Sequence, residues 1–172
     1  RLDIEKMAVA LDLTLPELAE RYLATFNYEF TLWDEYLEDS GNSQIIPTLI
    51  INSELSNDCI FLKFDNGLAK CVLYESRPLQ CELFPFWSMI MTNEENFKAN
   101  SKTCLGFKVK NQGNLEHKKF SQQFIKEQIK RERALEREFC LEMEVNKYEL
   151  FKVYPFLAEV KKLTHIKRKD EE

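Results

Sequence analysis

The chain is poor in glycine, with only 4 glycines in 172 residues. Glycine supplies the positive-φ positions of phosphate-binding loops and of the tight turns that join short strands. Its scarcity argues against a glycine-rich phosphate loop and against an all-β fold. The sequence also lacks an apolar run near 18 residues, so it predicts no transmembrane helix, and no secretory signal is visible.

The chain also has no excess of basic residues over acidic ones. The 24 Lys and Arg residues are outnumbered by 29 Asp and Glu residues, which gives a net charge of −5. Because nucleic-acid and acidic-membrane surfaces attract positive charge, we expect neither as a partner. The apolar fraction of 44%, with 13 Phe and 6 Tyr, is enough for a hydrophobic core, and the length fits one domain with an appendage.

The five cysteines are an odd number, whereas a secreted disulfide framework usually has an even number in a shorter chain. We therefore expect an intracellular, cytoplasmic protein whose thiols stay reduced and can act as ligands. Cys140 lies alone in a helical pattern, where a free cysteine behaves as a small buried hydrophobe. His117 and His165, in charged helical or tail sequence, are not expected to be ligands.

Three cysteines follow the spacing Cys59-x11-Cys71-x9-Cys81, and Cys104 follows beside Gly106. Thiolates gathered beside prolines and aromatic residues suit zinc or the iron of an iron–sulfur cluster. The spacing matches neither the short C-x2-C knuckles of zinc fingers nor a ferredoxin run. It therefore leaves the metal open. The candidate ligands are Cys59, Cys71, Cys81 and Cys104.

The residues around the third cysteine have more than one interpretation. Arg77 could offset the charge of the thiolates or anchor a carboxylate elsewhere. Tyr74 is predicted to be a core aromatic residue with a satisfied hydroxyl. Phe84, Phe86 and Trp87 would exclude water from the sulfurs, or they are simply core. The residues expected to surround the ligands are Tyr74, Arg77, Pro78, Phe84 and Pro85.

Hydrophobic periodicity predicts two helices at the start of the chain. The first covers residues 3–11. Thr14, with Glu17 three residues later, predicts the capping box of a second helix whose apolar stripe runs to Phe26. After it comes a strand at 45–51, which Pro47 makes an edge strand or divides into two pieces. A hairpin made by 59–64 and 70–74 follows, then one helical turn at 79–83 and a strand at 86–91. Loops are expected at 39–43 and 93–102.

The composition changes near residue 115. Residues 116–144 are rich in Lys, Arg and Glu with a sparse apolar stripe, which predicts a long, half-exposed helix. A last helix is expected over 145–163, broken near Pro155, before a frayed charged tail at 161–172. We expect a mostly helical α+β fold in which a small antiparallel sheet carries the cysteines. Residues 1–110 would be a metal-binding domain, and residues 111–172 a helical extension packed on it.

Four segments of the chain resemble a known family. They are Cys59-Ile-Phe-Leu, Cys71-Val-Leu-Tyr-Glu-Ser-Arg-Pro-Leu-Gln-Cys81, Phe84-Pro85-Phe86-Trp87 and Cys104-Leu-Gly106. They are similar to the cysteine-cluster family described as a putative zinc- or iron-chelating domain, and the resemblance covers about residues 2–107. Leu105 stands where that family usually has proline. The family's C-x-x-C-x-x-C-C run does not appear, and since the chain begins at Arg1 we expect that run to precede it.

The resemblance implies metal chelation by zinc or an iron–sulfur cluster, and a metal-binding module is the leading interpretation. A flagellin lysine N-methylase is similar to the family through the same cysteine pattern. This implies an alternative, an iron–sulfur enzyme such as a protein lysine N-methylase or an oxidoreductase, although no residue supplies an obvious methyl-donor site. A third interpretation is an interaction protein with a structural metal, which binds a protein partner through the helix at 115–144.

Overall fold

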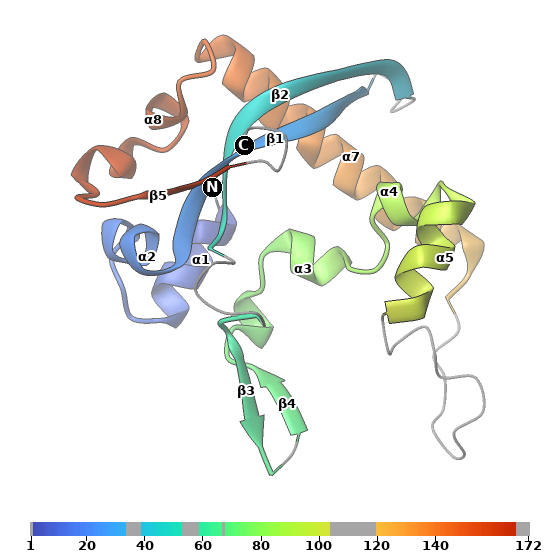
Figure 1. Cartoon of the computed structure of the whole chain (residues 1–172), viewed down its shortest axis with the longest axis horizontal. Helices are drawn as coiled ribbons and strands as arrows, with labels where there is room; N and C mark the ends of the chain where they lie inside the picture. The colour runs from blue at the N-terminus through green and yellow to red at the C-terminus, as the bar shows by residue number, and fades with distance from the viewer. Residues whose placement is uncertain (1, 34–38, 53–58, 67, 104–119, 168–172) are drawn as a thin grey trace.

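The chain adopts the expected α+β fold, built mostly from helices with two small sheets (Figure 1). The computed structural model describes residues 2–33, 39–52, 59–66, 68–103 and 120–167. The sheet with strand order β2-β1-β5 contains β1 (Leu23–Trp33), β2 (Asp39–Ile51) and β5 (Thr164–Ile166). The other pairs β3 (Leu62–Asp65) with β4 (Leu68–Cys71).

Helices lie at both ends and in the middle of the chain. The N-terminal pair is α1 (Leu2–Ala10) and α2 (Leu15–Tyr22). The middle contains η2 (Tyr74–Ser76), α3 (Leu79–Leu83), α4 (Ser88–Met91) and α5 (Glu94–Thr103). The C-terminal part contains α7 (Gln122–Val145), α8 (Leu150–Val153) and η3 (Pro155–Glu159). Within the described ranges, no helix has the length and apolarity that crossing a membrane requires.

The capping box predicted for α2 is confirmed. The Thr14 hydroxyl accepts a hydrogen bond from the N–H of Glu17 at 3.4 Å, and the Glu17 carboxylate accepts one from the N–H of Thr14 at 2.9 Å. The helix ends at Tyr22, however, and not near Phe26. Leu23 already begins β1 and pairs with Ile51 of β2, so tertiary pairing overrides the helical periodicity of these residues.

Strand β2 is longer than the sequence predicts. The polar segment 39–43, expected to be a loop, is its first part, and Ser43 lies opposite Thr31 in the ladder. The edge position predicted from Pro47 is confirmed, since β2 pairs with β1 alone in its sheet. Proline is tolerated there because an edge strand can leave one backbone position without a donor.

Two predictions for the middle of the chain are wrong. The expected strand at 86–91 contains the short helix α4, and the expected loop at 93–102 is largely α5. Asn93 begins α5 as a cap: its side-chain oxygen accepts hydrogen bonds from the N–H groups of Glu95 and Asn96 at 2.9 and 3.0 Å. The acidic first turn of α5 also suits the positive end of a helix. This capping signal outweighs the polar, loop-like composition.

The C-terminal part contains the long helix that was predicted, here as α7, followed by shorter pieces. The helix expected over 145–163 is broken, with α8 ending at Val153 and Pro155 starting η3. Part of the expected tail, Thr164–Ile166, is strand β5, which pairs in parallel with residues 24–26 of β1. The distance in sequence between the two partners explains why no local pattern predicts this pairing.

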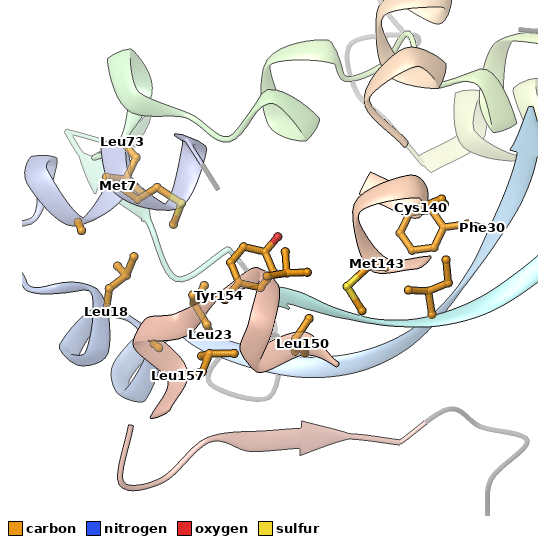
Figure 2. Packing of buried hydrophobic residues seen from close by; sticks show 14 of the residues in the cluster. Met7, Leu18, Leu23, Phe30, Leu73, Cys140, Met143, Leu150, Tyr154 and Leu157 are labelled. Carbon is orange, nitrogen blue, oxygen red and sulfur yellow. The ribbon is translucent and has the colours of Figure 1, made fainter. Parts of the chain in front are cut away.

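One cluster of buried side chains joins the two ends of the chain (Figure 2). Leu18 of α2, Ile46 of β2 and Met143 of α7 are all 0% exposed. Tyr154 and Leu157, from the C-terminal part, belong to the same cluster. Burial of this apolar surface is the main term that stabilises the fold. The C-terminal segments therefore complete the core that the N-terminal helices and the β1–β2 hairpin begin.

Met143→Ala should lower the free energy of unfolding by about 2–4 kcal/mol, because it leaves a cavity in this core. Chemical denaturation measures the change. Leu141→Ala is the matched control, since Leu141 lies on the same helix and is 48% exposed. The control should lose less than about 1 kcal/mol. Equal losses for the two variants would contradict the placement of α7.

Glu132 of α7 should make stability depend on pH. It accepts a hydrogen bond from the N–H of Ser88, which begins α4, yet burial raises the pKa of its carboxyl above the ordinary 4.5. The folded protein then holds this proton more tightly than the unfolded chain, so stability falls as pH rises from about 4.5 through the raised pKa. Glu132→Gln should flatten this fall in denaturation measured across pH. The exposed Glu138→Gln should leave it unchanged, and an unaltered profile in Glu132→Gln would refute the assignment.

Candidate metal centre

The β3–β4 hairpin brings the first two cysteines to the same end. The Cys59 carbonyl accepts a hydrogen bond from the N–H of Leu62 at 2.9 Å, just before β3 begins, and Cys71 ends β4 opposite Leu62. Asn66 has φ 51° at the turn, where the sequence predicts a reversal. The hairpin projects from the rest of the molecule (Figure 1). Cys71 therefore lies at the base of the hairpin, at the end of β4 and not at the start of the returning strand 70–74 that the sequence predicts, and Cys59 lies just before β3.

The third cysteine lies on the predicted helical turn, α3. The N–H of Cys81 donates to the carbonyl of Pro78 at 2.9 Å, which forms the first turn of this short helix. Phe84 follows in an extended conformation, as expected for a residue before proline. The segment between Cys71 and Cys81 thus folds back through η2 and α3, and it returns the third thiol toward the hairpin.

The thiol of Cys81 lies within electrostatic reach of both Cys59 and Cys71. Burial raises the pKa of Cys81, and the neighbouring thiols of Cys59 and Cys71 raise it further. Arg77 acts in the opposite direction, because its positive charge favours the thiolate. Repulsion among thiolates is relieved by a bound cation, and sulfur is the donor that zinc and iron–sulfur centres prefer. The chemistry of this donor set fits such a centre.

The three cysteines are free and differ in their exposure to solvent. Cys59 and Cys81 are exposed, Cys71 is half-buried, and all three are free. Counting the described residues only, no group of three or more His, Cys, Asp or Glu side chains has the spacing that holds a metal ion. Cys104, the fourth predicted ligand, and His117 lie outside the described residues.

Arg77 and Tyr74 form a contact beside the thiols. The Arg77 guanidinium carbon lies 4.2 Å from the centre of the Tyr74 ring, within the range of a cation–π interaction. Tyr74 is 60% exposed, so the expectation that it belongs to the core is wrong. The Nε of Arg77 is buried and has no hydrogen-bond partner among the residues described. Stacking on Tyr74 holds the guanidinium on the side of the cysteine cluster.

The aromatic residues after Cys81 pack against one another and against aromatic residues near the start of α7. Phe84 and Trp87 pack edge to face, with ring centres 5.2 Å apart, and Phe84 is 41% exposed. Phe86 packs against Phe120 and Phe124, near the start of α7. One function of this segment is therefore to attach α3 and α4 to the C-terminal helix.

Two interactions that position α3 were not predicted from the sequence. The Asp3 carboxylate accepts a hydrogen bond from the N–H of Leu79 at 2.7 Å, which joins α1 to the start of α3, and Asp3 also raises the pKa of Cys81. Arg131 of α7 pairs with Glu82 at 3.1 Å. The partners lie 76 and 49 residues apart, so no local pattern could identify them.

The remaining cysteine and histidine of the described chain lie elsewhere. Cys140 is 9% exposed in the core, as predicted. Burial, with a smaller effect of Glu136, raises the pKa of its thiol to about 11. His165 lies on β5, where its Nδ1 is 2.9 Å from the Thr25 hydroxyl.

The cysteines of the candidate centre lie in a segment that matches a known family. A family model described as a putative zinc- or iron-chelating domain matches residues 11–105. The matched segment contains Cys59, Cys71, Cys81 and Cys104, and it ends before α7. No solved structure matches the chain.

Alkylation should separate the exposed thiols from the buried one. In chelator-treated protein near pH 8, iodoacetamide should modify Cys59 rapidly and Cys81 less rapidly, because burial and the neighbouring thiols raise the pKa of Cys81. Mass spectrometry of peptides would show the order. Cys140 should react slowly, because a thiol with a pKa of about 11 is roughly one part in a thousand thiolate at that pH. All three should react alike in denaturant. Equally fast modification of Cys140 in the folded protein would be inconsistent with its burial.

Proposed function

We propose that this chain, which belongs to the CxxCxxCC family described as a putative zinc- or iron-chelating domain, binds its metal through Cys59, Cys71, Cys81 and Cys104. The observation that carries the proposal is the electrostatic proximity of the Cys81 thiol to the free thiols of Cys59 and Cys71. Cys104 is included because it lies in the matched segment and, with Gly106, resembles the last cysteine of the family's pattern. Four thiolates suit a tetrahedral zinc ion or an iron–sulfur cluster equally well.

The charge of such a centre needs compensation. Four thiolates around a divalent ion leave a net negative charge, and hydrogen bonds and nearby cations lower its free energy. Arg77 is well placed for this role, since its charge already favours the thiolate of Cys81 and its position is held by Tyr74. We assign Arg77 to charge compensation, with Pro78, Phe84 and Pro85 shaping the turn around Cys81.

The proposed setting is the cytoplasm, where thiols stay reduced and available to metals. The metal would hold the base of the hairpin to α3, because its proposed ligands come from both segments. Metal binding would therefore contribute to the stability of the middle of the chain, as it does in small metal-binding domains. Visible absorption distinguishes the two metals: protein purified without oxygen is brown with an iron–sulfur cluster and colourless with zinc.

Cys71→Ser and Cys81→Ser should each reduce the metal content of the purified protein and lower its melting temperature, because metal binding and folding are linked. Elemental analysis and thermal denaturation measure the two effects on the same samples. Cys140→Ala is the matched control, since it removes a thiol that is buried in the core. Its metal content should remain that of the parent protein. Unchanged metal content in both serine variants would rule out the proposed centre.

A further inference from the structure

The long helix α7 has an inner side that packs on the protein and an opposite side that is open to solvent. On the inner side Ile129, Cys140 and Met143 are buried, and the helix contacts β1, α3 and α4. Along the opposite side, exposed residues follow one another at alternating spacings of four and three, which is the spacing of a helix that packs side by side with another helix. This outward row consists of Glu127, Arg131, Ala134, Glu138, Leu141 and Val145.

The outward row exposes apolar surface near the end of the helix. Leu141 and Val145, one helical turn apart, are 48% and 82% exposed. Burial of these two side chains against a partner would remove apolar area from water, which is the main favourable term in protein association. The face of α7 therefore has a reason to be covered.

The exposed charges of α7 are divided between its two halves. Before Ala134, three exposed side chains are basic and one is acidic, for a net charge of +2; after it, three are acidic, for a net charge of −3. In chain order they are Lys126, Glu127, Lys130, Arg131, Glu138, Glu142 and Glu144.

This division opposes the dipole of the helix itself. The first turn has no acidic residue and the last turn has no basic one, whereas Glu142 and Glu144 lie in the last turn. A helix is stabilised by negative charge at its start and by positive charge at its end, and here the order is reversed. The charge pattern thus costs the isolated helix free energy, and a partner with the opposite pattern would offset that cost.

We propose that this face binds α7 of a second copy of the chain, with the two helices antiparallel and related by a twofold axis near Ala134. This arrangement sets the basic half of each helix beside the acidic half of the other, whereas a parallel pair would set like charges together. It also sets the negative end of each helix dipole beside the positive end of its partner. Ala134 is small, so the two backbones can approach closely at the axis.

The proposal goes beyond metal binding and does not rest on it. The outward row contains no cysteine. One helix from each copy makes a small interface, so we expect a weak, reversible dimer. Arg131 already pairs with Glu82 of α3 at 3.1 Å, and the experiments therefore leave it unchanged.

Reversal of charge tests the pairing. Lys126→Glu with Lys130→Glu makes both halves of the exposed face acidic, and Glu138→Lys with Glu142→Lys makes both halves basic. Sedimentation velocity of the full chain at roughly 10 to 300 µM should show a reversible dimer for the parent protein. Each double variant alone should dimerise at least about tenfold more weakly, because like charges then meet. An equimolar mixture of the two should regain the dimer, since every half then faces opposite charge.

The control carries the same change of net charge outside α7. Lys63→Glu with Lys162→Glu alters two exposed residues and should dimerise as the parent does. Helix content by circular dichroism and metal content should be the same in all of these proteins, which separates a lost dimer from a lost fold or a failed metal centre. Raising the salt concentration from about 50 to 500 mM should weaken the parent dimer, because exposed charges are screened.

Cross-linking tests the orientation. A carbodiimide joins amines to carboxylates, and a mixture of unlabelled and heavy-isotope-labelled chains identifies the links that form between copies. An antiparallel dimer should give mixed-isotope links between Lys130 of one copy and Glu138 of the other. A parent that stays monomeric throughout the concentration range, double variants that dimerise as well as the parent, no recovery on mixing, or links between copies only outside α7 would each overturn the proposal.

Discussion

Burial of the C-terminal segment against the N-terminal helices is the constraint on which the rest of the structure depends. Met143, Tyr154 and Leu157 enter the same core as Leu18 and Leu23, and all five are at most 6% exposed. The hairpin β1–β2 is held between these two parts, with β5 from the end of the chain along its other edge. Without that burial, the support of α3 would not exist.

The candidate metal centre depends on this framework through α3. This helix has five residues, too few to be stable alone. Asp3 holds its start, Leu83 is buried at its end, and Glu82 pairs with Arg131 of the long helix. These contacts determine where Cys81 lies relative to the hairpin.

Several features were predictable from local sequence because their causes are local. The capping box at Thr14, the turn after Asp65, the helical turn carrying Cys81 and the long helix α7 all follow from side-chain chemistry within a few residues. Cys140 was likewise identified as a buried residue from its isolated position.

The wrong predictions of secondary structure share a physical cause: contacts and caps that composition and periodicity do not report. Residues 23–26 have helical periodicity but pair as a strand, and residues 94–103 have loop-like composition but form a capped helix.

The sequence alone determined the membership of a chelating family and a mostly helical α+β fold, and it supplied the cysteines proposed as metal donors. Tertiary structure decided which groups meet. The proximity of Cys81 to Cys59 and Cys71, the hydrogen bond from Leu79 to Asp3 and the parallel pairing of β5 all join residues far apart in the chain. Local patterns report backbone preference and burial within a few turns, whereas contacts between distant segments follow from how the whole core packs.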